Sequence, residues 1–455
     1  MRRPSQPQVL SGPCPGRIRR TVWIGLARCA GALTAATTLR SADPPAPTDA
    51  DWTVHAQSTY IAQAHPGFAA AYSGENSLDS GSDDAHTVTA TLFLGRALWS
   101  GAGFYFDPEL TQGNGLSNTT GIAAFPNGEA THAGGTKFQY SIARFFLRQT
   151  FSLGGEQEPI ADGQNQLAGS QAVNRITVTV GKFAAADIFD GNAYAHDPRT
   201  QFLNWSLMDD TAWDYPANAK GYTGGAGVEW NTPQWTLRYG ILMEPVEANG
   251  PALDPHVDQA YGQVLEWERR YTAGGHPGAI RPMLYWNRAD MGGYAEALQE
   301  TNPNVISTRS TRSKAGAGLS WDQELTSALG AFARLGWNDG RSESWAFTEV
   351  DRAASAGLSW NGSSWNRAKD TLGVAAVVDG LSDLHRRYLA AGGYGFIVGD
   401  GRLNYSSEDV AETYYAWRPA GWITVTGDYQ FVLHPGYNAD RGPVSIFGVR
   451  VHLEY

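Results

Sequence analysis

The last eleven residues of the chain, from Ser445 to Tyr455, alternate strictly between two kinds of side chain. The apolar residues are Phe447, Val449, Val451, Leu453 and Tyr455, and the residues between them are Gly448, Arg450, His452 and Glu454. Successive side chains of a β-strand point to opposite faces, so this pattern predicts a strand with one apolar and one polar face. A terminal strand that is apolar outside, charged inside and ends on an aromatic residue is typical of an outer-membrane barrel. The alternative is an edge strand of a soluble sheet.

The same alternation recurs along the chain between turns rich in Gly, Asn, Asp and Pro. It predicts sixteen strands, an even number as single-chain bacterial barrels require. They fall near 52–64, 86–96, 100–107, 138–151, 174–183, 222–231, 234–244, 259–272, 279–289, 314–323, 328–338, 350–361, 370–379, 411–418, 421–434 and 444–455. The fold class expected is therefore all-β, a transmembrane antiparallel β-barrel of about sixteen strands. We expect the last strand to pair with the first and close the barrel.

Arginines on the polar faces decide which side of these strands looks inward. In 138–151 the polar face has Arg144 and Arg148, and Ala143, Phe145, Leu147 and Phe151 are assigned to the opposite face. Arg175 and Arg238 lie on the polar faces of two later strands. An arginine facing lipid costs about 2–4 kcal/mol at the bilayer midplane, so four would cost on the order of 8–16 kcal/mol. That is comparable with the whole stability of a protein, so these arginines must line the lumen.

Tryptophans on the apolar faces distinguish a barrel from a soluble sandwich, whose interior would be made of large aliphatic residues. Seven lie at or near predicted strand ends: Trp230, Trp235, Trp267, Trp286, Trp321, Trp337 and Trp360. Aromatic belts at the two membrane boundaries explain this placement.

Composition agrees with a barrel and excludes several other classes. Aromatic residues make up 12% of the chain, charged residues 17%, and mean hydropathy is −0.34. No apolar run reaches the roughly 18 residues of a spanning helix. Both cysteines, Cys14 and Cys29, lie in the first fifty residues, which excludes a disulfide framework or a cysteine-based site in the remainder.

The first fifty residues differ from the rest and predict a signal peptide, cleaved between Ala36 and Asp51. An arginine-rich start precedes an apolar run from Thr21 to Leu39. Residues 1–50 contain seven arginines and two aspartates. Residues 51–455 therefore have 27 basic and 43 acidic residues, a net charge of −16. This acidic balance argues against nucleic-acid binding.

Four segments interrupt the strands. Residues 108–137 and 152–172 are polar and glycine-rich, and we interpret both as extracellular loops. Residues 184–221 form a longer insertion with helical character between Gln201 and Met208, which is expected to fold inward and narrow the pore. A further insertion, 380–410, includes a short helical stretch around 383–391.

A series of motifs resembles the carbohydrate-selective porins of the OprB family and covers nearly all of residues 51–455. The main ones are Tyr72-Ser-Gly-Glu-Asn-Ser-Leu78, Asp107-Pro-Glu-Leu110, Gly115-Leu-Ser-Asn-Thr119, Phe125-Pro-Asn-Gly-Glu129, Arg144-Phe-Phe-Leu-Arg-Gln-Thr-Phe151, Asn165-Gln-Leu-Ala-Gly169, Asp187-Ile-Phe-Asp190, His196-Asp-Pro-Arg-Thr-Gln-Phe-Leu-Asn-Trp205 and Ala212-Trp-Asp-Tyr-Pro216. Each motif alone is weak, and their number and order make the match specific.

The resemblance implies a sixteen-stranded outer-membrane barrel for passive uptake of sugars such as glucose, with outer-membrane lipid around it. It implies arginines, carboxylates and an aromatic residue at a constriction formed by an inward loop. The candidates for lining the pore here are Arg144, Arg148, Arg175, Arg238, Glu229, Glu266 and Trp205. We expect Trp205 to face the arginines of 138–151 and 174–183 across a gap suited to one sugar ring. No cofactor or metal is expected, and the sequence leaves open whether three barrels form a homotrimer.

Three other functions are alternatives to a sugar channel. A general or anion-preferring channel is suggested by the excess of arginines in 138–183, although Glu229, Glu266 and other carboxylates balance it. An outer-membrane hydrolase is suggested only by doublets such as Asp209–Asp210, whose side chains would point apart on a strand. A soluble propeller or lectin disagrees with the leader and with the arginine argument.

Overall fold

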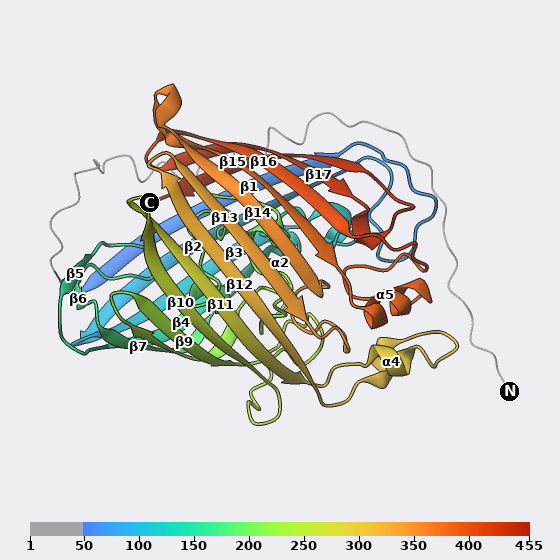
Figure 1. Cartoon of the computed structure of the whole chain (residues 1–455), viewed down its shortest axis with the longest axis horizontal. Coiled ribbons are helices and arrows are strands. Elements are labelled where there is room, and N and C mark those ends of the chain that lie inside the picture. The colour runs from blue at the N-terminus through green and yellow to red at the C-terminus, as the bar shows by residue number, and fades with distance from the viewer. Residues whose placement is uncertain (1–48) are drawn as a thin grey trace. The chain divides into compact units, whose positions relative to one another are not determined.

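The computed structural model describes residues 49–455, and the predicted signal peptide, apart from residues 49 and 50, lies outside the described residues. Sixteen antiparallel strands close into one barrel (Figure 1). In chain order they are β1 (Trp52–His65), β2 (Asp83–Trp99), β3 (Ala102–Gly113), β4 (Gly135–Ser152), β7 (Arg175–Phe183), β8 (Thr223–Asn231), β9 (Trp235–Leu242), β10 (Tyr261–Ala273), β11 (His276–Ala289), β12 (Arg312–Thr326), β13 (Leu329–Asn338), β14 (Arg352–Gly362), β15 (Arg367–Gly380), β16 (Glu408–Ala420), β17 (Ile423–Leu433) and β18 (Val444–Glu454). Each predicted strand is present, so the predicted fold class is confirmed.

The barrel closes where the last strand meets the first. β18 runs antiparallel to β1 in a register from Gln57↔Glu454 to Ala64↔Phe447. Two further backbone hydrogen bonds join Ala56 and Tyr455, at 3.0 and 2.8 Å. Every strand therefore has two neighbours, and the barrel has no open edge along which another chain could pair.

Alternating burial along the strands confirms which faces look inward. In β18, Phe447 and Val449 are exposed, whereas Arg450 and His452 on the opposite face are buried. Within the described residues, no helix is both long enough and apolar enough to cross a membrane.

One β-bulge changes the faces of β4. Asp107 pairs with Arg144 and the next residue, Pro108, pairs with Ile142, so Ala143 is left without a partner in the ladder. Proline has no N–H to donate, and such breaks in pairing occur at bulges. Ala143 is fully buried, whereas Ile142 is exposed. The assignment of Ala143 to the outer face is therefore wrong, whereas Phe145, assigned to the same face, is indeed exposed there.

The two ends of the barrel differ. At one end, here called the turn end, most strands are joined by short turns such as 100–101, 274–275, 327–328 and 421–422. The other, the loop end, has eight long connections, which include α4 (Tyr294–Ala297) and α5 (Asp383–Ala390) (Figure 1). The helix α5 confirms the helical stretch predicted in 380–410.

The two polar segments expected to be extracellular lie at opposite ends. Residues 114–134 join β3 to β4 at the loop end, whereas 153–174 join β4 to β7 at the turn end and form a two-stranded sheet of β5 (Gln157–Ile160) and β6 (Gly169–Ala172). Successive strands run in opposite directions, so the connections after β3 and β4 cannot share a side. The prediction that both segments are extracellular is therefore wrong.

Candidate pore and its lining

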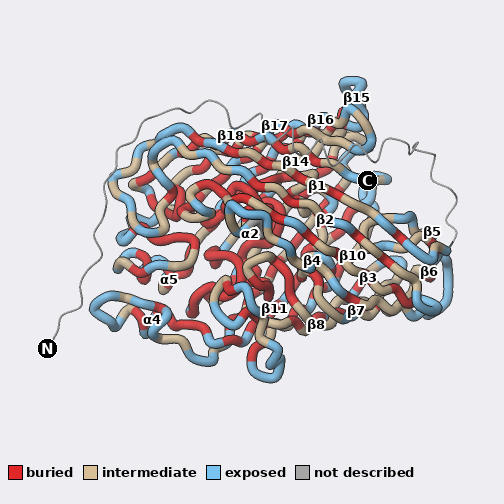
Figure 2. The backbone as a smooth tube through the Cα atoms, turned by 180° about the vertical axis from the view of Figure 1, so that it is seen from behind, coloured by how far each residue is buried: buried red, intermediate tan, exposed pale blue. Residues whose placement is uncertain are grey.

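Buried backbone fills much of the barrel towards the loop end (Figure 2). Most of it belongs to residues 184–222, here called the inward loop, which join β7 to β8 and include η3 (Ala185–Asp187) and α3 (Trp205–Met208). Phe202, Leu203, Leu207 and Ala212 of this loop are all fully buried. The inward fold of this insertion and the helical character within 201–208 are thus confirmed.

Carboxylates of the barrel wall hold the inward loop by its backbone N–H groups. Glu412 of β16 accepts hydrogen bonds from the amides of Leu203 and Asn204, at 2.7 and 2.9 Å. Glu266 of β10 accepts one from the amide of Asp190 at 2.7 Å. Buried backbone groups need partners, and the loop has too little secondary structure to supply its own.

Wall arginines bind the carbonyl groups of the same loop. Arg450 of β18 donates to the carbonyls of Pro198 and Gln201, at 2.6 and 2.7 Å. Arg334 of β13 donates to the carbonyl of Ala195 at 2.6 Å and to the Asp190 carboxylate at 2.9 Å. The wall therefore fixes the path of the loop with charged groups of both signs.

Asp214 connects the inward loop to a second segment inside the barrel, residues 339–351. Its carboxylate accepts hydrogen bonds from the amides of Trp345, Ala346 and Phe347, at 2.8, 2.9 and 3.3 Å. The same group pairs with the Lys314 ammonium at 3.1 Å, and both side chains have at most 1% of their area exposed.

Trp205 lies inside an aromatic cluster. Its ring stacks on Phe125 at 5.1 Å between centroids, with 13° between the planes, and contacts Phe347 and Tyr215 at 5.0 and 5.7 Å. Only 2% of its area is exposed. Trp205 therefore does not face the arginines of β4 and β7 across a gap, because aromatic rings from its own loop and from two other segments occupy its surroundings.

Three arginines instead meet around a cavity of about 270 Å³ beside β4 and β7. Arg144 and Arg148 reach it from β4, and Arg199 reaches it from the inward loop. The remaining lining comprises Phe93, Phe146, Gln164, Asn165, Gln166, Thr179, Phe183, Asp187 and Ile188. The cavity is close to the lower limit of small-molecule pockets, about 300 Å³.

The three arginines of the cavity are held differently. Arg144 makes a two-pronged contact with Asp187 at 2.7 and 2.6 Å, and Arg199 pairs with Glu129 at 3.1 Å. Arg148 donates to the backbone carbonyl of Asn165 at 2.9 Å and lies over the rings of Tyr105 and Phe146. Among the described residues no carboxylate pairs with Arg148, so its other N–H groups are the most available donors of the three.

The ion pair with Arg144 also influences the protonation state of Asp187. Burial is the largest single effect and raises its pKa, but the charge and hydrogen bonds of Arg144, with a hydrogen bond from the Ala184 amide, together outweigh burial and lower the pKa below its usual value. Asp187 is therefore a carboxylate at neutral pH and can accept hydrogen bonds beside the arginines.

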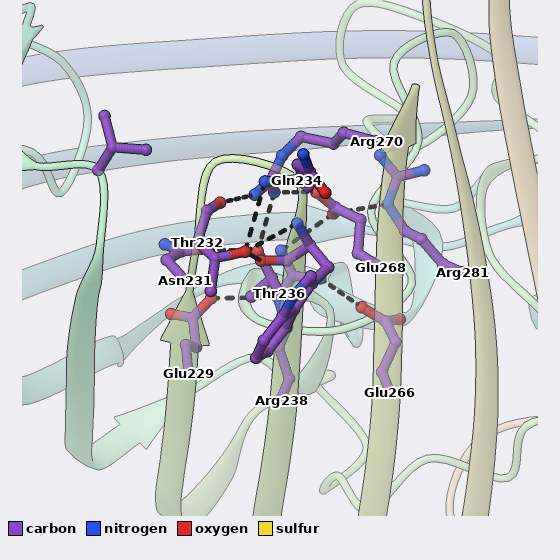
Figure 3. A network of polar contacts seen from close by, with 12 residues as sticks. Glu229, Asn231, Thr232, Gln234, Thr236, Arg238, Glu266, Glu268, Arg270 and Arg281 are labelled. Carbon is purple, nitrogen blue, oxygen red and sulfur yellow. Dashed lines mark hydrogen bonds and ion pairs between the residues drawn. The ribbon is translucent and has the colours of Figure 1, made fainter. Parts of the chain in front are cut away.

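A belt of charges lies along the wall from β8 to β12, and Figure 3 shows its part from Glu229 to Arg281. Arg238 contacts three carboxylates, Glu229 at 3.1 Å, Glu266 at 2.7 Å and Glu268 at 3.1 Å. Arg281 then joins Glu268 to Asp322. Opposite charges alternate from strand to strand, so this part of the lumen has no large excess of either sign.

Arg175 lies at the turn end of β7, where it pairs in register with Asn231 of β8. Its guanidinium pairs with Glu158 of β5 at 2.8 Å. Arg238, Glu229 and Glu266 thus share one belt of the inner wall. Arg144 and Arg148 line the cavity, whereas Arg175 and Trp205 belong to neither.

Comparison with known proteins agrees with this architecture. A sequence model described as "Carbohydrate-selective porin, OprB family" matches residues 84–455, which is most of the chain. This chain belongs to the OprB family of carbohydrate-selective porins. No match was found among curated protein sequences.

A solved porin structure has the same fold. The high-pH structure of OprB from Pseudomonas putida is 16% identical, with a TM-score of 0.68, over 89% of this chain and 94% of that chain. The outer-membrane channel DcaP of Acinetobacter baumannii is 10% identical, with a TM-score of 0.48, over 90% of this chain and the whole of that chain. The porin is thus a carbohydrate channel of the bacterial outer membrane, and a channel rather than an enzyme.

Sequence analysis of this porin missed several residues of the lumen. Arg281 and Asp322 lie on the polar faces of predicted strands, and the same alternation that selected Arg238 could have found them. Arg199 and Asp187 lie within motifs that resemble the family, but these motifs are on the inward loop, where no strand periodicity indicates a direction.

The porin's acidic doublet, Asp209–Asp210, is buried in the inward loop. Burial, with the neighbouring Asp190 charge, raises the pKa of both side chains. Neither residue lines the cavity, so the doublet does not have the open cleft that a pair of hydrolytic carboxylates needs.

Glu244, just after β9, is expected to make the stability of the porin depend on pH. The residue is fully buried, and burial together with Asp214 raises its pKa well above the usual value. Above the unfolded pKa of about 4.3, the folded porin retains a proton that the unfolded chain loses, so stability falls as pH rises. In Glu244→Gln we expect this fall to be smaller, as measured by urea unfolding midpoints from about pH 5 to about pH 9. Equal slopes for the parent and the variant would contradict the prediction.

Proposed function

We propose that this porin is a passive diffusion channel for monosaccharides such as glucose, and that it delivers them to the periplasm. The observation that most supports the proposal is the cavity of about 270 Å³ between Arg144, Arg148 and Arg199. Its volume suits one sugar ring rather than a longer oligosaccharide. In outer-membrane barrels the short turns face the periplasm, which places the turn end of this barrel at the exit.

The chemistry of the cavity suits a neutral sugar. Arginine supplies a fixed fork of donors, and the Asp187 carboxylate and the Asn165 amide supply acceptors for hydroxyl groups. Phe93, Phe146 and Phe183 give the cavity an apolar side against which the C–H groups of a sugar can pack. These contacts leave the solute free to exit, as conduction requires binding that is weak enough to release.

The alternating belt separates this proposal from an anion-preferring channel. Each of Arg238 and Arg281 contacts at least two carboxylates, and Arg144 is neutralised by Asp187. An anion would therefore meet carboxylates all along the β8 to β12 side of the path. The outward aromatic and aliphatic residues, among them Trp286 and Val449, suit contact with outer-membrane lipid.

Liposome swelling tests the proposal. We expect vesicles that contain the porin to swell in glucose and xylose much faster than in disaccharides, and faster than in amino acids of similar size. Reversal potentials in a salt gradient would check for ion preference, which we expect to be small. Equal swelling rates for sugars and amino acids would indicate a general channel, and a strong anion preference would favour the alternative.

A further inference from the structure

Residues 153–174, here called the turn-end hairpin, are much longer than the other connections at that end. Gly163 and Gln166 close its tip with two mutual backbone hydrogen bonds of 3.1 and 3.0 Å. Between them, Asn165 has a φ of +54°, in the left-handed region that asparagine tolerates better than most residues. The tip is therefore a tight turn of defined shape.

The tip inserts into the barrel and docks on the inner wall of three strands. Asn165 donates its amide to Asp107 of β3 at 2.8 Å and accepts, through its carbonyl, from Arg148 of β4 at 2.9 Å. Gln164 donates to Gln57 of β1 at 3.1 Å. Asp107 and Gln57 are buried residues of the inner face, so the tip lies within the lumen.

These contacts hold the tip without burying much apolar surface. In the described structure, Leu167 is the residue of the hairpin that packs against the hydrophobic core, and it is itself only partly buried. Most residues of 151–161 are exposed. The hairpin can leave the wall by exchanging polar contacts for water, without opening an apolar core.

The base of the hairpin has the freedom that such a movement needs. Gly154 and Gly155 have φ values of +88° and +94°, and a Cβ on either would meet nothing within 4 Å. Neither glycine is packed against the wall, and glycine adopts both signs of φ readily.

We propose that the turn-end hairpin is a movable plug of the exit, and that Asn165 at its tip is a specificity-determining residue of the cavity. Arg148 donates to the Asn165 carbonyl, and a sugar hydroxyl is an acceptor of the same kind. A sugar that draws the Arg148 guanidinium towards its own hydroxyls takes that donor from the Asn165 carbonyl, which loosens the plug on the path that the solute takes out. The role of the sugar rests on the proposed function, whereas the movement of the plug can be tested with ions alone.

A reversible cross-link tests the movement. His55 of β1 and Asp162 of the hairpin approach to 3.2 Å, with 21% and 51% of their side chains exposed. Because both cysteines of the chain lie within residues 1–50, His55→Cys with Asp162→Cys would supply the only thiols of residues 51–455. A short reducible bis-methanethiosulfonate reagent would join them, with mass spectrometry to confirm the bridge. The two single-cysteine variants, treated in the same way, are the controls.

We expect the bridged porin to lose conductance in planar bilayers severalfold and to lose glucose-driven swelling, and a reductant to restore both. A second variant, which lacks residues 156–173 and joins Gly155 directly to Asn174, should conduct more than the parent. Parental conductance in the fully bridged porin, or in the shortened one, would overturn the plug. If the parent conducts ions but passes no sugar, the proposed function fails, while the effect of the bridge on ion current still tests the plug.

Discussion

Replacing Asp214 by alanine is expected to destabilise the porin by about 3–5 kcal/mol, the usual cost of leaving one member of a buried ion pair alone. The change leaves the Lys314 ammonium buried without its 3.1 Å partner. It also removes the acceptor of three amides in 339–351. The midpoint of urea unfolding in detergent, followed by the electrophoretic mobility of the folded barrel, measures the loss.

Besides lowering stability, Asp214→Ala is expected to change the pore, because it removes the contacts between Asp214 and residues 339–351. Because Asp214 joins the inward loop to 339–351, the variant should also show larger and noisier single-channel currents. Two control variants separate charge from shape. The double variant Asp214→Asn with Lys314→Met removes both charges and should recover most of the stability. The double variant Asp214→Ala with Glu244→Gln also removes Glu244, the nearby acid that could pair with Lys314 in place of Asp214. A loss below about 1 kcal/mol in both Asp214→Ala variants would show that the pair contributes little.

The barrel was predictable because its signal is local. Each strand presents its own alternation, and the lipid cost of an outward arginine fixes the direction of the faces, as at Arg144 and Arg148. The error at Ala143 arose from a non-local cause, since the bulge depends on Pro108 in the neighbouring strand. The position of 152–172 at the turn end was within reach of the sequence, because counting strands from β1 already determines the end at which each connection lies.

The lining of the lumen was only partly predictable. Strand periodicity placed Arg238, Glu229 and Glu266 on the inner faces of their strands, and in the structure Arg238 contacts both carboxylates. The inward loop has no such periodicity, and two of the rings around Trp205, Phe125 and Phe347, are far away in sequence. A tryptophan that can stack on other rings buries its area there rather than facing water, and no sequence pattern indicates those partners.

Arg148 is the residue of the cavity whose replacement should change sugar preference most. Arg144 and Arg199 are occupied by carboxylates, whereas Arg148 has spare donors above the rings of Tyr105 and Phe146. A hydrogen bond to a charged group contributes about 1.5–3 kcal/mol, so Arg148→Ala should weaken glucose binding by about 10- to 100-fold. The loss of the side chain should also widen the path and raise the conductance. Concentration-dependent block of the ion current by glucose measures both effects in one recording.

Two further replacements at the same position separate charge from volume. Arg148→Met retains most of the bulk without donors, so it should lose glucose block with little rise in conductance. Arg148→Lys retains the charge but not the planar fork, and we expect its glucose block to lie between those of the parent and the methionine variant. A purely structural arginine would behave otherwise, because the barrel would unfold more easily while glucose block and conductance matched the parent. That result in a normally folded Arg148→Ala protein would exclude Arg148 from the filter and leave Arg144 and Arg199 to account for selection.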